Sequence, residues 1–211
     1  MQPTKMNDFN EIMTGRRSIR TYDQNVTITR DEMKEILTKA ATAPSSVNLQ
    51  PWRFLVVDTP EGKETLLPLA KFNKTQVETS SAVIAVFADM QSPDYLEEIL
   101  TQAVDKGFMP AEVKERQLQT VSGLLAGMDH EKLKEMNVID ASLISMQLML
   151  VARAYGYDTN PMGGYEKDQI AEAFGMDKER YYPVMLLSIG KAVDEGYSSV
   201  RLDTDSIVEW R

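Results

Sequence analysis

The sequence predicts an α/β (α+β) fold in which a central sheet is flanked by helices. Three short apolar runs have the length and composition of buried strands, at residues 53–58, 82–88 and 181–190. Helical patterns separate these runs, and no repeat, low-complexity stretch or linker divides the 211 residues. We therefore expect a single domain over residues 1–211.

Capping signals predict two helices before the first strand. Asn7 is expected to cap a short helix that stops at Gly15. A longer helix is expected to begin at the capping box of Thr29 and Glu32 and to end before Pro44, because the residue before a proline disfavours the helical conformation.

A polar loop between two prolines, "PSSVNLQPW" at residues 44–52, precedes the first strand. After this strand, Thr59 and Pro60 predict another helix start, since proline suits the first helical position. Pro68 is expected to interrupt this helix.

Residues 93–135 form a mostly polar helical region with weak periodicity and several glycines. Such a region is an excursion from the core. Two interpretations remain open from the sequence: a lid or flap on the substrate side of a pocket, or a simple pair of surface helices.

The segment "DASLISMQLMLVARAYGY", residues 140–157, predicts a helix with Asp140 as cap and Gly156 as stop. Apolar residues leave it almost no polar face, so it should be buried nearly all round. We expect one side to face the sheet and the other to face a second subunit. A central helix of a monomer is the alternative.

Composition excludes several kinds of site. There is no cysteine, which rules out disulfides, zinc-thiolate sites, cysteine-bound iron–sulfur clusters and a catalytic thiol. His130, the only histidine, lies in the charged stretch "GMDHEKLKE" and is expected in solvent, so no metal site is predicted. The net charge of −9 argues against general binding to nucleic acid.

No targeting or membrane segment is expected. The N-terminal stretch "MQPTKMNDFNE" has no apolar region of the kind that a signal peptide needs. The longest clearly apolar runs fall far short of the roughly 20 residues that cross a bilayer. Together with the lack of cysteine, this predicts a cytoplasmic location and no membrane partner.

The stretch "TGRRSIRTYD" places three positively charged side chains close together in an acidic chain. Arg16, Arg17 and Arg20 stand beside Ser18 and Gly15. Guanidinium groups match phosphate oxygens in charge and geometry, and a glycine allows close backbone approach. Neither a P-loop nor a dinucleotide-binding glycine motif is present, so arginines would hold any phosphate.

The loop at residues 44–52 holds a second polar cluster. Ser45, Ser46, Asn48 and Gln50 could bond to a polar ring edge or a polyol. A turn-rich connector is the alternative interpretation of this composition.

In their order along the chain, these motifs resemble the FMN-dependent nitroreductase family. The resemblance rests on "RRSIRTY", "APSSVNLQPWRFLVV", "PMGGYEKDQIAEAFGM", a strand ending in "SIGKA" and a tail with "VRLDTDSIVEW", and it covers essentially the whole chain. It implies a nitroreductase-like fold with a central mixed sheet, in an intertwined homodimer with two FMN sites at the subunit interface. The excursion at 93–135 would lie over the pocket, and residues 198–211 would form a C-terminal tail.

The family's FMN contacts can be carried over residue by residue. The matching positions are Arg16, Arg17, Ser18, Arg20, Pro44, Ser45, Ser46, Asn48, Lys74, Gln76, Met162, Gly163, Gly164 and Arg201. The N-terminal arginine segment would grip the phosphate and ribityl chain, with Arg201 also reaching the phosphate. Gly163 and Gly164 would present a backbone amide to flavin N5. An amide side chain is usual near the pyrimidine edge, where Lys74 and Gln76 are the two candidates.

One further implication concerns the polar loop. Pro44, Ser45, Ser46 and Asn48 match the loop that one subunit lends to the flavin of the other.

The resemblance implies an NAD(P)H-dependent oxidoreductase that passes hydride through FMN to nitroaromatics, quinones or related electrophiles, by a ping-pong mechanism. The cofactor carries the chemistry, so no catalytic side chain is needed. Enone reduction, flavin reduction or flavin destruction on the same scaffold are alternatives, as are a flavin-binding protein without turnover and an anion-binding module without flavin. Some family members carry a glutamate where Gly163 stands, so nitro reduction is not assumed.

Overall fold

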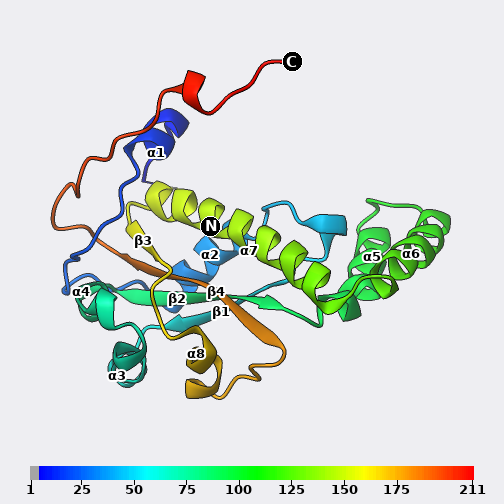
Figure 1. The fold of residues 1–211 in the computed structure, drawn as a ribbon, viewed down its shortest axis with the longest axis horizontal. Helices are drawn as coiled ribbons and strands as arrows, with labels where there is room; N and C mark the ends of the chain where they lie inside the picture. Colours follow the sequence, from blue (N-terminus) through cyan, green and yellow to red (C-terminus); the bar gives the residue numbers. More distant parts are fainter. Residues whose placement is uncertain (1–4) are drawn as a thin grey trace.

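Four strands form one sheet in the computed structural model, which describes residues 5–211 (Figure 1). They are β1 Trp52–Val57, β2 Ala82–Asp89, β3 Asp158–Met162 and β4 Tyr181–Gly190. Their order across the sheet is β1-β2-β4-β3, and each of the three pairings is antiparallel. The expected mixed sheet is thus corrected to an antiparallel one, in which β4 lies between β2 and β3 and runs antiparallel to both.

The three strands expected from apolar runs are confirmed, and β3 is an addition. Its sequence, Asp-Thr-Asn-Pro-Met, is poor in residues that favour strands. Pro161 is tolerated because β3 lies at the edge of the sheet, where one side of the strand needs no ladder bond. Tertiary pairing with β4 therefore makes this segment a strand.

Eight α-helices and several short 3₁₀ turns surround the sheet within the described residues. The helices are α1 Phe9–Gly15, α2 Arg30–Ala40, α3 Pro60–Leu66, α4 Lys74–Thr79, α5 Leu96–Asp105, α6 Ala111–Ala126, α7 His130–Ala154 and α8 Lys167–Ala173. The 3₁₀ turns are Ser46–Asn48, Leu67–Leu69, Lys71–Asn73, Ser92–Tyr95 and Thr204–Ser206.

Side-chain caps set the starts of the early helices. The side chain of Thr29 accepts from the backbone N–H of Glu32 at 3.2 Å, as the capping box predicts. The cap of α1 is Asp8 rather than Asn7, because Asp8 reaches the N–H of Glu11 at 2.9 Å.

The long helix α7 begins well before the expected start. Its cap is Asp129, whose carboxylate accepts from the N–H of Lys132 at 2.8 Å. Asp140 is therefore not a cap but an interior residue of α7, with its side chain turned to another element. The stop is confirmed: the helix ends at Ala154, and Gly156 follows with a φ of +83°.

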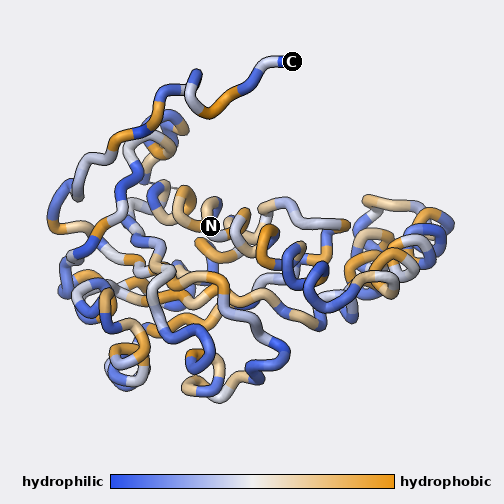
Figure 2. Tube along the Cα trace, in the orientation of Figure 1, coloured by the Kyte–Doolittle hydropathy of each residue, from blue (hydrophilic) through white to orange (hydrophobic). Residues whose placement is uncertain are grey.

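The core consists of two apolar layers, one on each face of the sheet. In β2, Ala82, Ile84 and Val86 pack with α2 and α7 on one face. The alternate residues Val83 and Phe87 pack with α3, α4 and α8 on the other face. Figure 1 shows α7 above the sheet, with α3 and α8 below it, and Figure 2 shows the apolar colouring concentrated along the sheet between them.

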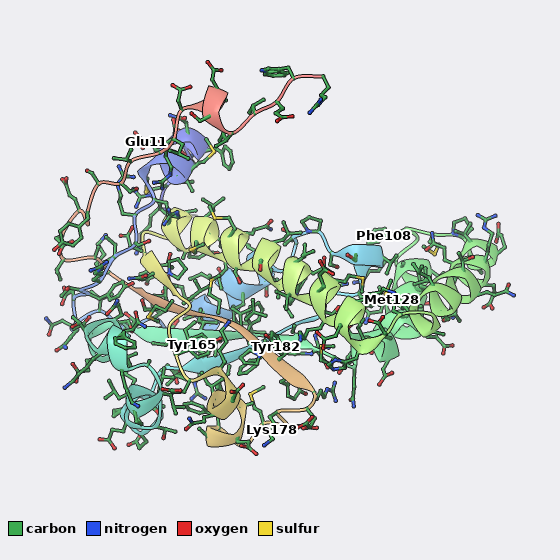
Figure 3. All side chains as sticks on the ribbon, viewed as in Figure 1. Glu11, Phe108, Met128, Tyr165, Lys178 and Tyr182 are labelled. Carbon is green, nitrogen blue, oxygen red and sulfur yellow. The ribbon has the colours of Figure 1, made fainter. Side chains whose placement is uncertain are left out.

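The excursion is a pair of helices, α5 and α6, that projects from one end of the sheet (Figure 1). A small cluster built on Leu49, Leu96 and Leu100 holds it, and none of the residues of α6 is buried. Phe108, labelled at this end of the molecule in Figure 3, is 80% exposed between the two helices.

An ionic cluster fastens the base of the excursion to the sheet. Asp89, fully buried at the end of β2, accepts two bonds of 2.9 Å from Arg180 and lies 3.0 Å from Arg53. Arg180 also donates to the hydroxyl of Tyr95 at 2.7 Å. The buried charge is therefore paired on both oxygens.

Within residues 5–211, α7 is the one helix that is long and apolar enough to cross a membrane by length and composition. Ile144 and Leu148 of this helix are fully buried in the layer against the sheet. Buried core helices have the same length and composition, so this helix is weak evidence for a membrane span.

Candidate functional site

A cavity of about 670 Å³ opens beside the N-terminal arginine segment. Its walls come from the segment after α1, the start of α4, the end of β3 and the residues after β4. The predicted residues that line it are Ser18, Arg20, Gln76, Met162 and Gly163. The lining residues that sequence reasoning did not name are Thr21, Phe72, Asn73, Thr75, Asn160, Pro161, Asp194, Gly196 and Tyr197.

Strand β3 brings the distant motifs together. Ser18 forms an isolated parallel bridge with Thr159, and the N–H of Ile19 donates to the carbonyl of Thr159 at 3.1 Å. The arginine segment thus runs alongside β3, which ends at Met162 just before Gly163. Two motifs about 140 residues apart in the chain therefore form adjacent walls of one cavity.

Arg16 is a half-buried cation with one unpartnered nitrogen. Its Nη1 atom is buried and has no hydrogen-bond partner among the described residues. Burial lowers the pKa of Arg16, and the neighbouring charges of Arg201, Arg17 and Arg153 lower it further. Such crowding of like charges is unfavourable until an anion is present. The cluster of these four arginines fits a phosphate group.

Arg153, a residue of α7 that the sequence analysis did not single out, completes this cluster. It pairs with Asp158 at 2.6 Å, while its Nε is buried without a partner among the described residues. A Cβ atom at Gly15 would lie 2.7 Å from Nη2 of Arg153. A larger residue at this position would displace the guanidinium from its present place. A basic residue such as Arg153 is common in the last turn of a helix, so its position in the sequence did not indicate its contact with Gly15.

Arg17 and Arg201 are at the edges of the cluster. Arg17 donates to the backbone carbonyls of Thr14 and Arg16 at 2.9 and 3.1 Å, and it lines a neighbouring cavity of about 420 Å³. Arg201 is exposed in the tail and donates to Ser199 at 2.7 Å.

Residues after β4 form the outer wall. The guanidinium of Arg20 lies 5.7 Å from the ring centroid of Tyr197. Gly196 has a φ of +68°, and a Cβ atom there would lie 2.8 Å from Ile19. Glycine is therefore required for this segment to pass over the arginine segment.

The two candidates at the start of α4 lie in different surroundings. Gln76 is buried, lines the cavity and donates to Asn73 at 3.3 Å. Lys74 is exposed, pairs with Glu78 at 3.5 Å and is absent from the lining. Asn73 itself donates to the carbonyl of Gly164 at 2.9 Å. Two amide side chains, those of Asn73 and Gln76, therefore line the cavity in the stretch where the resemblance implies one amide.

The two glycines after β3 leave open space. A Cβ atom at Gly163 or Gly164 would meet nothing within 4 Å. Both glycines are exposed, and Gly163 lines the cavity. A flat group could therefore approach the main chain closely at this point.

The loop at residues 44–48 lies away from this cavity. Both the N–H and the hydroxyl of Ser46 donate to the carboxylate of Asp140, at 3.0 to 3.2 Å. Burial raises the pKa of Asp140, and the two bonds from Ser46 oppose this shift. Asn48 lines a separate cavity of about 310 Å³ that also includes Arg53 and Lys106. One chain alone does not bring Pro44, Ser45, Ser46 and Asn48 to the arginine cluster.

Histidine and the acidic side chains are the possible metal ligands within residues 5–211. His130 is exposed and lies 3.4 Å from Glu131. Among residues 5–211, no group of three histidine or acidic side chains is placed to hold a metal ion.

Comparisons with known proteins agree with this geometry. The model of the nitroreductase family matches residues 13–191. A Bacillus subtilis protein named "Putative NAD(P)H nitroreductase YdgI" is 65% identical, over 98% of this chain and 99% of its own. The "CLA biosynthesis enone reductase" of Lactiplantibacillus plantarum is 39% identical, over 93% of this chain and 91% of its own. The crystal structure of a "putative nitroreductase in complex with FMN" from Exiguobacterium sibiricum superposes with a TM-score of 0.97 at 63% identity, covering 100% of both chains.

Proposed function

Because the chain belongs to the nitroreductase family, we propose that it is an FMN-dependent oxidoreductase that transfers hydride from NAD(P)H to nitroaromatics, quinones or related electrophiles. The observation that carries this proposal is the half-buried Arg16, whose Nη1 has no partner among the described residues, two residues before Ser18 in the wall of a cavity that Gly163 also lines. The arginine cluster suits a phosphate, and the open backbone at Gly163 suits a flat ring system.

The residues present fit FMN. Arg16, with Arg17, Ser18 and Arg201, would hold the phosphate, because this cluster has an excess of donors and of positive charge. Arg20 would lie along the ribityl chain and ring edge. The remaining predicted contacts at the ring are Gln76 or Lys74, Met162, Gly163 and Gly164, and we add Asn73, which lines the cavity and donates to Gly164.

When bound, FMN supplies the redox chemistry, accepting hydride from NAD(P)H and delivering it to the acceptor in a ping-pong sequence. The chain's own residues bind and orient. The open backbone at Gly163 and Gly164 can donate an N–H to the ring without an ionisable side chain. The free space beside these glycines leaves room for NAD(P)H and acceptor to stack in turn.

We further propose an intertwined homodimer, with the loop at Pro44–Asn48 serving the flavin of the second copy. This accounts for the distance between that loop and its own chain's cavity. On α7, Ile139, Leu143 and Met146 form an exposed apolar stripe, with 55, 45 and 40% of each residue accessible. Trp210 in the C-terminal tail is also exposed. Figure 1 shows that this tail runs away from the body of the chain.

Two finer assignments complete the proposal. The chain acts as one domain over residues 1–211, with the helix pair at 93–135 over the pocket of the dimer. It resides in the cytoplasm, which suits an enzyme that draws on NAD(P)H and has no cysteine.

Enone reduction is the second candidate function. It is favoured by the 39% identity to the enone reductase of Lactiplantibacillus plantarum over nearly the whole chain. Both reactions use the same cofactor and cavity, and they differ only in the acceptor.

The test is a visible absorption spectrum of the purified protein, before and after anaerobic addition of NADH or NADPH. Flavin bands that bleach with one nicotinamide are expected, followed by recovery when a quinone, nitroaromatic or enone is added. The acceptor that restores the bands fastest identifies the reaction. Absence of flavin bands, even after incubation with FMN, would overturn the proposal.

Replacing Gln76 and Lys74 separately by alanine distinguishes the two candidates at the ring edge. Gln76→Ala should weaken FMN binding by roughly tenfold, the cost of one buried hydrogen bond of about 1 kcal/mol and of an unpaired neighbour. Lys74→Ala should change it little, because its surface pair with Glu78 contributes less than about 1 kcal/mol. Titration of each variant with FMN, followed by flavin fluorescence, measures both effects, and the opposite ranking would assign the contact to Lys74.

A further inference from the structure

The loop that follows α2 is held in an unusual backbone conformation. Val47, Asn48 and Gln50 have φ angles of +44°, +58° and +49°, in the left-handed region that favours glycine. A β-branched residue such as Val47 is rare there. Non-glycine residues keep this conformation only where the surroundings impose it, and such strain gathers at functional sites.

Several contacts hold the two ends of this loop. At its far end, Leu49 is buried against α5, and the N–H of Gln50 donates to the hydroxyl of Ser45 at 3.0 Å. Arg53 donates to the carbonyl of Gln50 at 3.1 Å.

At the near end, a side chain of another helix, Asp140 of α7, accepts hydrogen bonds from the loop. Both of its oxygens accept from the N–H of Ser46, at 3.1 and 3.0 Å, and one also accepts from the Ser46 hydroxyl at 3.2 Å. Asp140 is only 2% exposed and lies within α7, which packs against α2 and the sheet. A rigid helix thus fixes the residue that immediately precedes the strained pair Val47 and Asn48.

We infer that Asp140 is a positioning residue for cofactor binding: its carboxylate holds the loop from Ser45 to Gln50 in the shape that presents Asn48 to the FMN of the second copy. This inference rests on the proposed function. It assigns a role to a buried carboxylate that does not touch the cavity of its own chain.

Three variants test the inference against a matched control. Asp140→Asn keeps the size of the side chain but turns one acceptor into a donor that faces the Ser46 N–H. We expect it to raise the FMN dissociation constant by at least about tenfold, because loss of a buried charged hydrogen bond has that effect. Asp140→Ala should do the same. Ser46→Ala removes only the hydroxyl bond and should give a smaller increase, and it tests the contact without removing a buried charge.

Asn137→Ala is the control. Asn137 lies one turn before Asp140 on α7, is fully buried, and donates to the carbonyl of Asp89 at 3.0 Å rather than to the loop. Its loss should lower the unfolding temperature while leaving the FMN dissociation constant within about twofold of the wild-type value. Equal effects of Asn137→Ala and Asp140→Asn on FMN affinity, or no effect of Asp140→Asn and Ser46→Ala, would overturn the inference.

A mixed dimer tests whether Asp140 acts on the second copy. Subunits carrying Asp140→Asn and Arg16→Ala are co-expressed with different tags and purified on both. In such a dimer, the first subunit's intact arginine cluster meets the intact loop of the second, so the mixed dimer should bind about half the wild-type amount of FMN. Each variant alone should bind little. No recovery in the mixed dimer would show that the loop serves its own chain, and the inference would fail.

The two failures are separable. If the wild-type protein takes up no FMN, the proposed function is wrong. If wild-type protein binds FMN and Arg16→Ala releases it, while Asp140→Asn and Ser46→Ala bind it normally, only the role of Asp140 is wrong.

Discussion

Arg16→Ala is expected to weaken FMN binding by roughly 10- to 100-fold, since a charge-assisted hydrogen bond contributes about 1.5–3 kcal/mol. The same change should not destabilise the protein without FMN. In that state Arg16 has an unpartnered buried nitrogen and is crowded by Arg201, Arg17 and Arg153. Removing it relieves repulsion, so the FMN-free variant should unfold at a temperature no lower than wild type. A variant that binds FMN more weakly but is no less stable without FMN would indicate that Arg16 serves to bind an anion.

The measurements are FMN titration by fluorescence and thermal unfolding by circular dichroism, each on wild type and variant. Arg30→Ala is the control, because the side chain of Arg30 is 85% exposed, lies 3.6 Å from Asp58 and does not line the cavity. It should change neither quantity appreciably. Replacing Arg16, Arg17 and Arg20 together should release the flavin during gel filtration. Unchanged FMN affinity in this triple variant would show that these arginines do not bind the FMN phosphate.

The elements that sequence analysis predicted are those with strong local signals. The strand β2 is buried at all of its positions, and the capping box of α2 forms as its residues indicate. Two elements depended on tertiary contacts. Strand β3 exists because it pairs with β4 and bridges to Ser18. The first turns of α7 are rich in charge, and Asn137 within them is held by its bond to Asp89, a contact that no periodicity reveals.

The same distinction applies to the site. The arginine segment was identifiable because three cations stood together in an acidic chain. Arg153 and Asn73 were not identifiable, because only folding brings Arg153 of α7 to the arginine cluster and Asn73 to the cavity. Asp140 had a plausible local role as a helix cap, and its actual partner lies 94 residues away.

Leu148→Asp is expected to have the largest effect on stability. Leu148 is fully buried between α7 and the sheet, and an unpaired carboxylate there has no partner and no access to water. The cost is several kcal/mol, a large part of the roughly 5–15 kcal/mol by which domains are stable. We expect the unfolding midpoint to fall by more than about 10 °C, or the protein to remain insoluble. Thermal unfolding of the soluble fraction measures this, and a stable variant would show that α7 is not packed as described.

Leu143→Asp, on the same helix, distinguishes the core from the proposed dimer interface. Leu143 is 45% exposed in the single chain, so a carboxylate there remains hydrated and should leave the fold intact. If the apolar stripe of α7 meets a second copy, the same charge becomes buried in the dimer, and the variant should sediment as a folded monomer. Since the loop around Asn48 then loses the flavin that it serves, FMN affinity should fall with the dimer. A folded Leu143→Asp dimer with normal flavin content would exclude this face of α7 from the interface, whereas a folded monomer that retains FMN would exclude the shared site.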